Sequence, residues 1–290
     1  PGLTVAKNEG YKTVISIRGV GNETNQNAIA APSVAFHMDG IFVASPFSLQ
    51  TDFMDVERIE VLRGPQGTLF GQNSTGGAIN VITKAPSVDG FSGKADLTLG
   101  SDYDYTKFRA TFNIPISDSV ATRFAVSSTK HDGFTENVFN GQDLDDADQL
   151  SIRSDWFFDL GGANTLRIFG QYFEAESNGA AIKGFYDTTP GERQLSQNTL
   201  SAYELESTIL GAIAEFDLGV GVLKVLASSQ SDDIYVIRDN DRHNQFGSDN
   251  LIDNFASVNG PFYPAFEFNP ETSAVDTTTF EVNLISTEPV

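Results

Sequence analysis

The sequence contains no cysteine among its 290 residues. A disulfide framework and a thiolate metal site are therefore both excluded. Long apolar runs are also missing, because none approaches the roughly 18–20 residues of a membrane-spanning helix. A membrane is still compatible with the sequence, since a transmembrane barrel strand needs only about 10 residues of alternating polarity.

Basic residues are scarce: 18 Lys and Arg stand against 39 Asp and Glu, which gives a formal net charge of −21. This acidic balance argues against nucleic acid as a partner. Residues 1–86 hold 6 basic and 7 acidic side chains, whereas residues 87–290 hold 12 and 32. The change in charge near Pro86 predicts a domain boundary. The favoured interpretation of the excess of acidic side chains is a solvated, self-repelling protein surface.

The chain is rich in glycine and phenylalanine, with 26 Gly and 23 Phe. This composition favours turns and aromatic-rich strands over helices. In the first segment, Asp39-Gly40 lies between two β-rich runs and predicts a tight hairpin, because glycine tolerates the positive φ of the turn. Short strands are expected at 13–18, 34–38, 41–43, 59–62 and 78–82.

The stretch 63–77, RGPQGTLFGQNSTGG, is dense in glycine. Its spacing does not match the G-x-G-x-x-G of dinucleotide-binding folds, and no lysine follows the glycines as it does in a phosphate-binding P-loop. The glycines predict instead a compact, turn-dense surface on which backbone approaches backbone closely.

Four stretches within residues 1–86 together resemble the plug of TonB-dependent outer-membrane receptors. They are IRGVG at 17–21, the run 34–43 around Asp39-Gly40, DVERIEVLRGP at 55–65, and GQNSTGGAINVITK at 71–84. The resemblance implies a mostly β protein with a globular α+β plug inside a transmembrane barrel of about 22 strands. It also implies the outer membrane of a Gram-negative bacterium, with the plug facing the periplasm and the long loops outside the cell. Uptake would be powered by TonB with ExbB–ExbD, acting through a TonB box that these residues do not contain.

The resemblance implies roles for individual plug residues. Arg18 and Arg63 are expected to pair with glutamates of the barrel wall, and such buried pairs cost several kcal/mol when one partner is lost. The alternative is that these arginines satisfy backbone carbonyls within the plug. The plug motif and plug–barrel contact are assigned to Arg18, Gly19, Asp39, Gly40, Arg58, Arg63, Gly64, Pro65, Gly76 and Gly77.

Residues 87–290 show the period-two alternation of β-strands. Phe91, Leu97 and Leu99 share one face and Lys94 and Asp96 the other. Further alternating or β-rich runs lie near 107–114, 121–131, 150–158, 166–172, 207–216, 222–232 and 278–286. The sequence therefore predicts about eight antiparallel strands of barrel length.

The predicted connections alternate in length. Tight turns are expected around 116–119, 160–163 and 218–221, and long loops at 132–148, 175–206 and 233–277. Short turns on one rim and long loops on the other are typical of an outer-membrane barrel. A closed barrel of eight strands is filled by its own side chains and cannot hold a plug. Residues 1–86 are therefore predicted to be an N-terminally truncated plug, and 87–290 the first part of a barrel that lacks its C-terminal strands.

Candidate functional residues are few, and nothing indicates catalysis or a cofactor. His37 is expected to pack in a plug strand, whereas His131 and His243 fall at or in long loops, where they can meet a ligand. The loop 233–277 is unusually aromatic, and aromatic side chains anchor ligands well or pack the loop on itself. The ligand-binding candidates are His131, His243, Tyr235, Phe246, Phe262 and Tyr263.

Asp143, Asp145, Asp146 and Asp148 form the densest acidic cluster. Their oxygen atoms are of the kind that binds Ca²⁺, but the EF-hand pattern is absent, and a solvated loop is favoured. No metal site is therefore predicted beyond these weak candidates.

The leading functional hypothesis is active uptake of a scarce small molecule across the outer membrane, with a ferric siderophore or another metal chelate as cargo. Cobalamin, nickel chelates, saccharides and aromatic compounds remain alternatives. A passive porin-like channel or an adhesin with a static plug is a rival from another class, and a soluble acidic β-sandwich binding module is a third.

Overall fold

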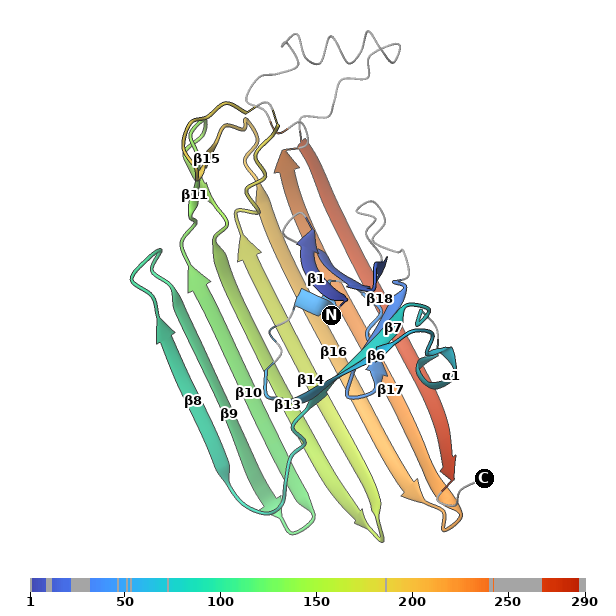
Figure 1. The fold of residues 1–290 in the computed structure, drawn as a ribbon. Coiled ribbons are helices and arrows are strands. Elements are labelled where there is room, and N and C mark those ends of the chain that lie inside the picture. The colour runs from blue at the N-terminus through green and yellow to red at the C-terminus, as the bar shows by residue number, and fades with distance from the viewer. Residues whose placement is uncertain are drawn as a thin grey trace.

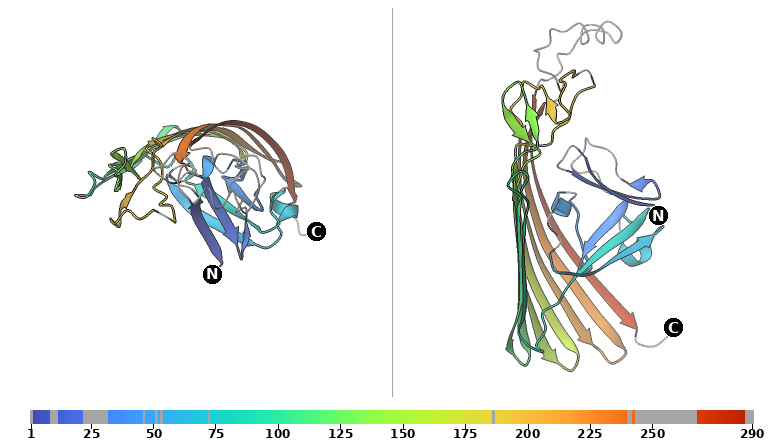
Figure 2. Two further views of the ribbon diagram at one scale, coloured as in Figure 1. Left: turned by 90° about the horizontal axis from the view of Figure 1, so that it is seen from above. Right: turned by 60° about the vertical axis from the view of Figure 1, so that its left-hand side comes forward.

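The computed structural model describes residues 2–8, 12–21, 32–45, 47–50, 52, 54–71, 73–185, 187–239, 242 and 268–286. These residues form one large antiparallel sheet, here called the wall, and several small sheets of the N-terminal segment that lie against its concave side (Figures 1 and 2). No helix in the described ranges has the length and apolar character needed to cross a bilayer.

The wall has eight strands in the order β18-β17-β16-β14-β13-β10-β9-β8, and each strand is antiparallel to its neighbours. The strands are β8 Ser92–Leu99, β9 Thr106–Ser117, β10 Val120–His131, β13 Ala147–Gly161, β14 Asn164–Ser177, β16 Ala202–Asp217, β17 Gly221–Asp239 and β18 Phe268–Ser286. The predicted set of eight antiparallel strands is confirmed, although several are longer than the alternation indicated.

Polar and apolar residues alternate between the two faces of the wall. The outer face exposes large apolar side chains, among them Phe91 at 70%, Leu210 at 55% and Phe280 at 72%. On the inner face Arg153 and Phe169 are buried beneath the N-terminal segment. An apolar face of this size is unusual for a protein in water and is the surface that a lipid-facing wall requires.

The connections alternate as predicted. Two residues join β9 to β10 and β13 to β14, and three join β16 to β17; at the opposite end six residues join β8 to β9, and 15 or more separate the strands of each other pair. At that end two long loops are bound together in a three-stranded sheet of β11 Thr135–Asn137, β12 Gln142–Leu144 and β15 Gln194–Leu195. Buried Asn137 links the loops, donating to the Gln197 carbonyl at 2.9 Å and accepting from the Gln197 N–H at 3.0 Å.

The N-terminal segment forms two sheets. The first contains β1 Leu3–Asn8, β2 Lys12–Ile17 and β3 Val20–Gly21; the second has the order β5-β4-β7-β6, with β4 Val34–Met38, β5 Ile41–Phe42, β6 Val56–Arg63 and β7 Gly77–Thr83. Only β4 and β7 pair in parallel. A 3₁₀ turn, η1 Ser48–Gln50, and one turn of helix, α1 Gly67–Phe70, complete it.

Apolar residues of both small sheets form one core, which includes Ile17, Phe36, Met38, Ile79 and Val81. Gly77 begins β7 with φ of 146°, and a Cβ there would overlap the Leu62 carbonyl oxygen of β6. A side chain at this position is therefore excluded, and the backbones of the glycine-rich stretch approach each other closely, as its composition predicts.

Candidate functional site

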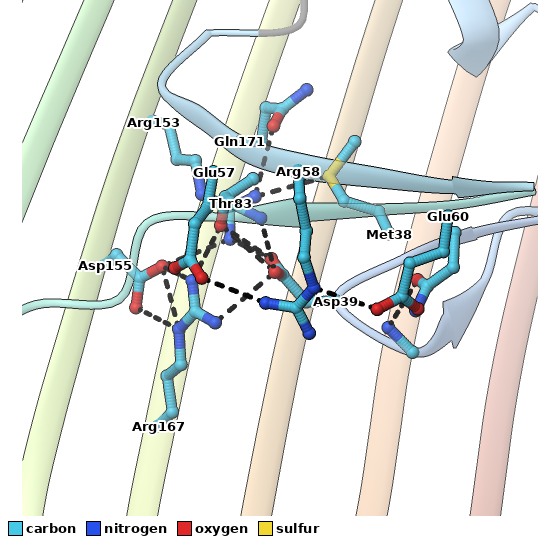
Figure 3. Close-up of polar contacts among 12 residues, drawn as sticks. Met38, Asp39, Glu57, Arg58, Glu60, Thr83, Arg153, Asp155, Arg167 and Gln171 are labelled. Carbon is cyan, nitrogen blue, oxygen red and sulfur yellow. Dashed lines mark hydrogen bonds and ion pairs between the residues drawn. The ribbon is translucent and has the colours of Figure 1, made fainter.

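The N-terminal segment and the wall meet in a buried cluster of four charged side chains (Figure 3). Asp39 supplies one of them from the turn of the β4–β5 hairpin, where its φ is 54°. Its carboxylate lies 2.8 Å from Arg153 Nη2 and 3.4 Å from Arg167 Nη1. It also accepts hydrogen bonds from the Thr83 N–H at 2.9 Å and hydroxyl at 2.8 Å. The hairpin tip is thus held to β7 and to the wall by one side chain.

The wall supplies the other three members of the cluster. Asp155 lies 3.1 Å from Arg153 and 2.5 Å from Arg167, so that two carboxylates face two guanidinium groups. The side chains of Asp39, Arg153 and Asp155 are only 1%, 4% and 3% exposed. Arg153 also lies over the Phe169 ring at 4.0 Å. Removal of one member of such a buried set leaves an unbalanced charge and costs about 3–5 kcal/mol.

Two further ion pairs join the N-terminal segment to the wall. Asp55 makes a two-pronged contact with Arg123, including one bond of 2.7 Å. Asp52 lies 2.8 Å from Lys107 and accepts a hydrogen bond from Ser127 at 2.6 Å. Burial acts to raise the pKa of Asp52, but the hydrogen bonds and charges of these partners outweigh it and lower the pKa below its ordinary value.

Apolar contacts flank the ionic cluster. Phe47 is fully buried in a wall cluster that includes Phe173, Leu205 and Ile234. Ile41, next to the hairpin turn, packs with a second wall cluster of Phe169, Ile209, Ile213 and Leu226. Gly40 lies so close to the wall that a Cβ would stand 3.3 Å from Leu226 Cδ2. The hairpin tip therefore fits the wall by shape as well as by charge.

Hydrogen bonds without a cationic partner extend the contact toward β17. Ser48 donates to both carboxylate oxygens of buried Asp232, at 2.7 and 2.8 Å. Gln230 donates to the Phe42 carbonyl at 2.6 Å and accepts from the Ala44 N–H at 3.4 Å. The segment 39–55 is therefore fastened to six of the eight wall strands, from β9 to β17.

A pocket of about 430 Å³ lies between this contact and the three-stranded loop sheet. Its lining combines Gln50 of the N-terminal segment with wall and loop residues, including His131, Phe134, Tyr203 and Arg238. The His131 ring is stacked between Tyr105 at 5.9 Å and Phe134 at 6.1 Å. An aromatic stack beside carboxylates and a guanidinium group provides both planar surfaces and hydrogen-bonding groups for a small molecule.

The assigned motif residues take different places. Asp39 and Gly40 contact the wall directly. Arg18 and Gly19 form the exposed β2–β3 turn, with φ of 54° and 79°. Arg63, Gly64 and Pro65 lie at the end of β6, away from the described wall, and Gly76 and Gly77 precede and begin β7. Arg58 is exposed and pairs at 2.9 Å with Glu57 and Glu60 of its own strand.

The predicted pairing of Arg18 and Arg63 with wall glutamates stays a prediction. In the described part of the chain, the ion pairs between the two units have the opposite polarity. The N-terminal segment provides the carboxylates of Asp39, Asp52 and Asp55, and the wall provides lysine and arginine.

The ligand-binding candidates are not brought together. His131 lines the outer pocket. Tyr235 alternates on β17 with buried Ile234 and Val236, so it lies on the other face of the wall. His243, Phe246, Phe262 and Tyr263 lie outside the described residues.

Three of the four aspartates of the acidic cluster have separate side-chain partners, and Asp143 accepts a hydrogen bond from Asn178 through its main-chain carbonyl. Asp145 accepts from Thr135 and from the Ala181 N–H, Asp146 from the Asn178 N–H, and Asp148 pairs with Lys130. Among the described residues, no three acidic or histidine side chains converge on a point that suits a metal ion. Asp143, Asp145 and Asp146 thus connect the loops, Asp148 pairs across the neighbouring strands β10 and β13, and the structure offers no support for the calcium alternative.

Several site residues were not singled out from the sequence. The sequence places these residues within alternating or β-rich runs and attaches no motif to them: Arg153, Asp155, Arg167, Lys107 and Arg123. The sequence feature that could have identified them is a charged residue at a position whose side chain points to the inner face of the wall. On that face the neighbours are water or protein rather than lipid. The period-two pattern reveals the face but not the partner.

Residues 1–78 match the family model described as TonB-dependent Receptor Plug Domain. The pesticin receptor of Yersinia pestis is 34% identical over 124 residues, which are 41% of this chain and 17% of that receptor. The catecholate siderophore receptor Fiu of Escherichia coli K12 is 32% identical over 154 residues, 51% of this chain and 19% of that protein. The chain thus spans less than a quarter of the length of the curated relatives it matches.

Solved structures have the same fold. The ferric yersiniabactin uptake receptor FyuA from Yersinia pestis superposes with a TM-score of 0.72 at 21% identity, covering 82% of this chain and 37% of that one. The open form of Fiu from Escherichia coli K12 gives a TM-score of 0.67 at 17% identity, covering 100% and 43%. At these identities the likeness shows the fold, in which plug and wall adjoin.

Proposed function

We propose that the whole receptor takes up a metal chelate. The premise is that this chain belongs to the TonB-dependent outer-membrane receptors, which are a family of transport receptors rather than enzymes. The cargo class that we propose is the ferric siderophore. The observation that carries this proposal is the plug hairpin fastened to the wall directly beneath a pocket lined by both. In this arrangement, cargo bound in the pocket contacts the plug, so that cargo binding and the position of the plug affect each other.

The coupling runs through the segment 39–55. The plug carboxylates Asp39, Asp52 and Asp55 each face a basic side chain of the wall, so these contacts hold the resting plug in place without excess charge. Ion pairs of this kind specify one arrangement while leaving an alternative accessible, because the net gain of a buried pair is small compared with the cost of leaving one partner alone. A pulling force on the plug can therefore exchange one set of contacts for another. We assign that force to TonB with ExbB–ExbD.

Cargo recognition is assigned to the outer pocket. His131 between Tyr105 and Phe134 presents planar edges, and Arg238 and Gln50 provide donors. The aromatic edges suit an aromatic chelate and the donors suit its oxygen atoms, while Asp145 and Asp146 in the same lining already accept hydrogen bonds from the loops. Relatives of the chain include a receptor for catecholate siderophores, and one of the similar solved structures is a ferric yersiniabactin uptake receptor, which agrees with this class.

The topology supports a proposed assignment of the two sides of the membrane and of the two domains. Long loops and the pocket lie at one end of the wall, which we place outside the cell, and the short turns at the periplasmic end. The plug is proposed to comprise residues up to 86 and the barrel wall to begin at 87.

The test is uptake by Gram-negative cells that lack their own siderophore receptors and express the whole receptor. Cells with and without TonB are supplied with ⁵⁵Fe as catecholate, hydroxamate or citrate chelates. Uptake of one chelate only when TonB is present is the expected result. Equal uptake without TonB indicates a passive channel, and absence of iron uptake from every chelate rejects the cargo class.

The pocket is tested by His131→Ala, with Tyr235→Ala as the matched control on the opposite face of the wall. The first is expected to weaken chelate binding at least about tenfold, since stacking and polar contacts are both lost. The second is expected to leave binding unchanged. Equal effects would refute the placement of the site.

A further inference from the structure

Four basic side chains form a descending series on the inner face of β8, β9 and β10. From the loop end toward the short-turn end they are Lys107, Arg109, Lys94 and Arg123. Strand register sets their order: Lys94 pairs with Thr111, and Arg123 with Asn113, so each step moves two residues along β9. Two residues of an antiparallel strand span about 7 Å. The series, here called the basic ladder, therefore descends by about 7 Å a step along the strand direction, while its members are spread sideways over three strands that lie about 4.8 Å apart.

Plug carboxylates occupy two positions of the basic ladder. Asp52 pairs with Lys107 at the loop end, and Asp55 pairs with Arg123 at the other end. Between them Arg109 pairs with Asp96 of the wall at 2.9 Å, where both side chains are partly exposed. Lys94 has no ion pair among the residues the structure describes. The plug thus covers the two ends of the series and leaves its middle open.

A cavity of about 490 Å³ lies over this open middle, between the plug and β8–β10. Four basic residues, Lys84, Lys94, Arg109 and Arg123, line it against two acidic ones, Asp55 and Asp96. This excess of positive charge stands out in a chain whose net charge is −21. A cleft walled by protein concentrates the field of its charges, so the cavity attracts anions.

The basic ladder also adjoins the outer pocket. Thr129 lines that pocket, and in the strand register it lies opposite Lys107, the first position of the series. A molecule that leaves the pocket toward the plug therefore meets Lys107 first.

We propose that the basic ladder is the transit path of anionic cargo through the receptor. In the resting state Asp52 and Asp55 stand in for the cargo's anionic groups; when the plug moves, they withdraw and the cargo passes from one cation to the next. A chelate with several negative groups can contact Lys107 and Arg109 at once, because these two residues lie on one strand about 7 Å apart. This proposal rests on the proposed uptake function and adds the charge of the cargo and its route.

The test measures the electrostatic potential of the path and needs no cargo. A cysteine-free form of the whole receptor receives Thr111→Cys, which places a thiol in the cavity lining, or Ser119→Cys, a control in the exposed turn between β9 and β10. Each purified protein is treated with an anionic (sulfonatoethyl) and a cationic (trimethylammonioethyl) methanethiosulfonate reagent. The ratio of the two reaction rates reports the sign and size of the local potential.

Relative to the control, the Thr111→Cys thiol is expected to favour the anionic reagent by roughly tenfold. Adding Lys94→Gln with Arg109→Gln should abolish the preference, and adding Asp52→Asn with Asp55→Asn should increase it. Preference for the cationic reagent, or a ratio that does not respond to either pair, overturns the proposal.

Transit itself is tested by uptake of the ⁵⁵Fe chelate identified above. Lys94→Gln is expected to slow uptake several-fold at unchanged surface binding, whereas Lys130→Gln, a charge removed from an exposed position on β10, leaves both unchanged. Unchanged uptake in Lys94→Gln rejects the path while active transport stands. Absence of TonB-dependent uptake in the unaltered receptor rejects the transport function separately, and the thiol measurement remains valid in that case.

Discussion

Replacement of Asp39 by asparagine tests the junction between plug and wall most directly. Asparagine keeps the shape of the side chain and can still accept the hydrogen bond from the Thr83 N–H. The substitution removes one of two carboxylates from a cluster in which Asp39 and Arg153 are almost fully buried. Arg153 and Arg167 are then left with Asp155 alone, and the cluster gains a net positive charge without access to water.

The magnitude follows from the burial of the partners. Loss of one member of a buried ion pair costs about 3–5 kcal/mol. At about 1.4 kcal/mol for each factor of ten, the undocked state of the hairpin becomes about 10² to 4 × 10³ times more populated. Amide protons of the β4–β5 hairpin, which exchange when the hairpin leaves the wall, should exchange faster by the same factor.

The assay is hydrogen–deuterium exchange of the whole receptor in detergent, followed by mass spectrometry of peptides that cover residues 34–43. Glu60→Gln is the control, because it removes the same charge from an exposed pair on the same plug sheet, where little effect is expected. Equal exchange rates in Asp39→Asn and Glu60→Gln would refute the view that the ionic cluster fixes the plug.

Three further measurements address other contacts. Phe47→Ala should cost about 3–5 kcal/mol of plug docking, because a fully buried ring is lost from a closed apolar cluster, and exchange of residues 43–50 should rise accordingly. Burial lowers the pKa of His37 from 6.5 to about 4, so between these pH values the unfolded plug binds more protons than the folded plug. The free energy of unfolding of the plug should therefore fall as the pH drops from about 6.5 to 4. In acid-induced unfolding, His37→Gln should abolish this dependence. Asn137→Ala should loosen the loop sheet by about 1–3 kcal/mol, seen as faster exchange at residues 135–144 and 194–197 with no change in the wall.

The architecture of the wall was predictable because a strand between lipid and protein must alternate at every residue. Phe108, Phe112 and Trp156 lie on the exposed outer face as their spacing indicates. The turn lengths were predictable for a similar reason, since glycine pairs such as Gly161-Gly162, both with positive φ, permit only a tight reversal.

The plug–wall contacts were not predictable in the same way. Asp39 was recognised as part of a turn motif, but its partners lie more than 110 residues away, and nothing local distinguishes Arg153 from Lys94 or Arg109. The polarity of the pairs was also out of reach, because alternation shows which face a charge occupies and not which charge opposes it. The resemblance to a known family predicts that plug and wall are in contact. Only the three-dimensional arrangement identifies the residues that make the contact.

The sequence distance between plug residues and their seats on the wall has a consequence for biogenesis. Ser48 and Asp232 are 184 positions apart, and Gln230 lies 188 positions from Phe42. Contacts between residues so far apart in the sequence form late in folding, because the chain loses the entropy of closing a long loop before the contact adds any stabilisation. The plug is synthesised first and yet cannot reach its seat until β17 has been added to the sheet. During that interval the faces of Ile41 and Phe47 have no cover, so a nascent receptor needs a chaperone, or rapid sheet assembly, to escape aggregation.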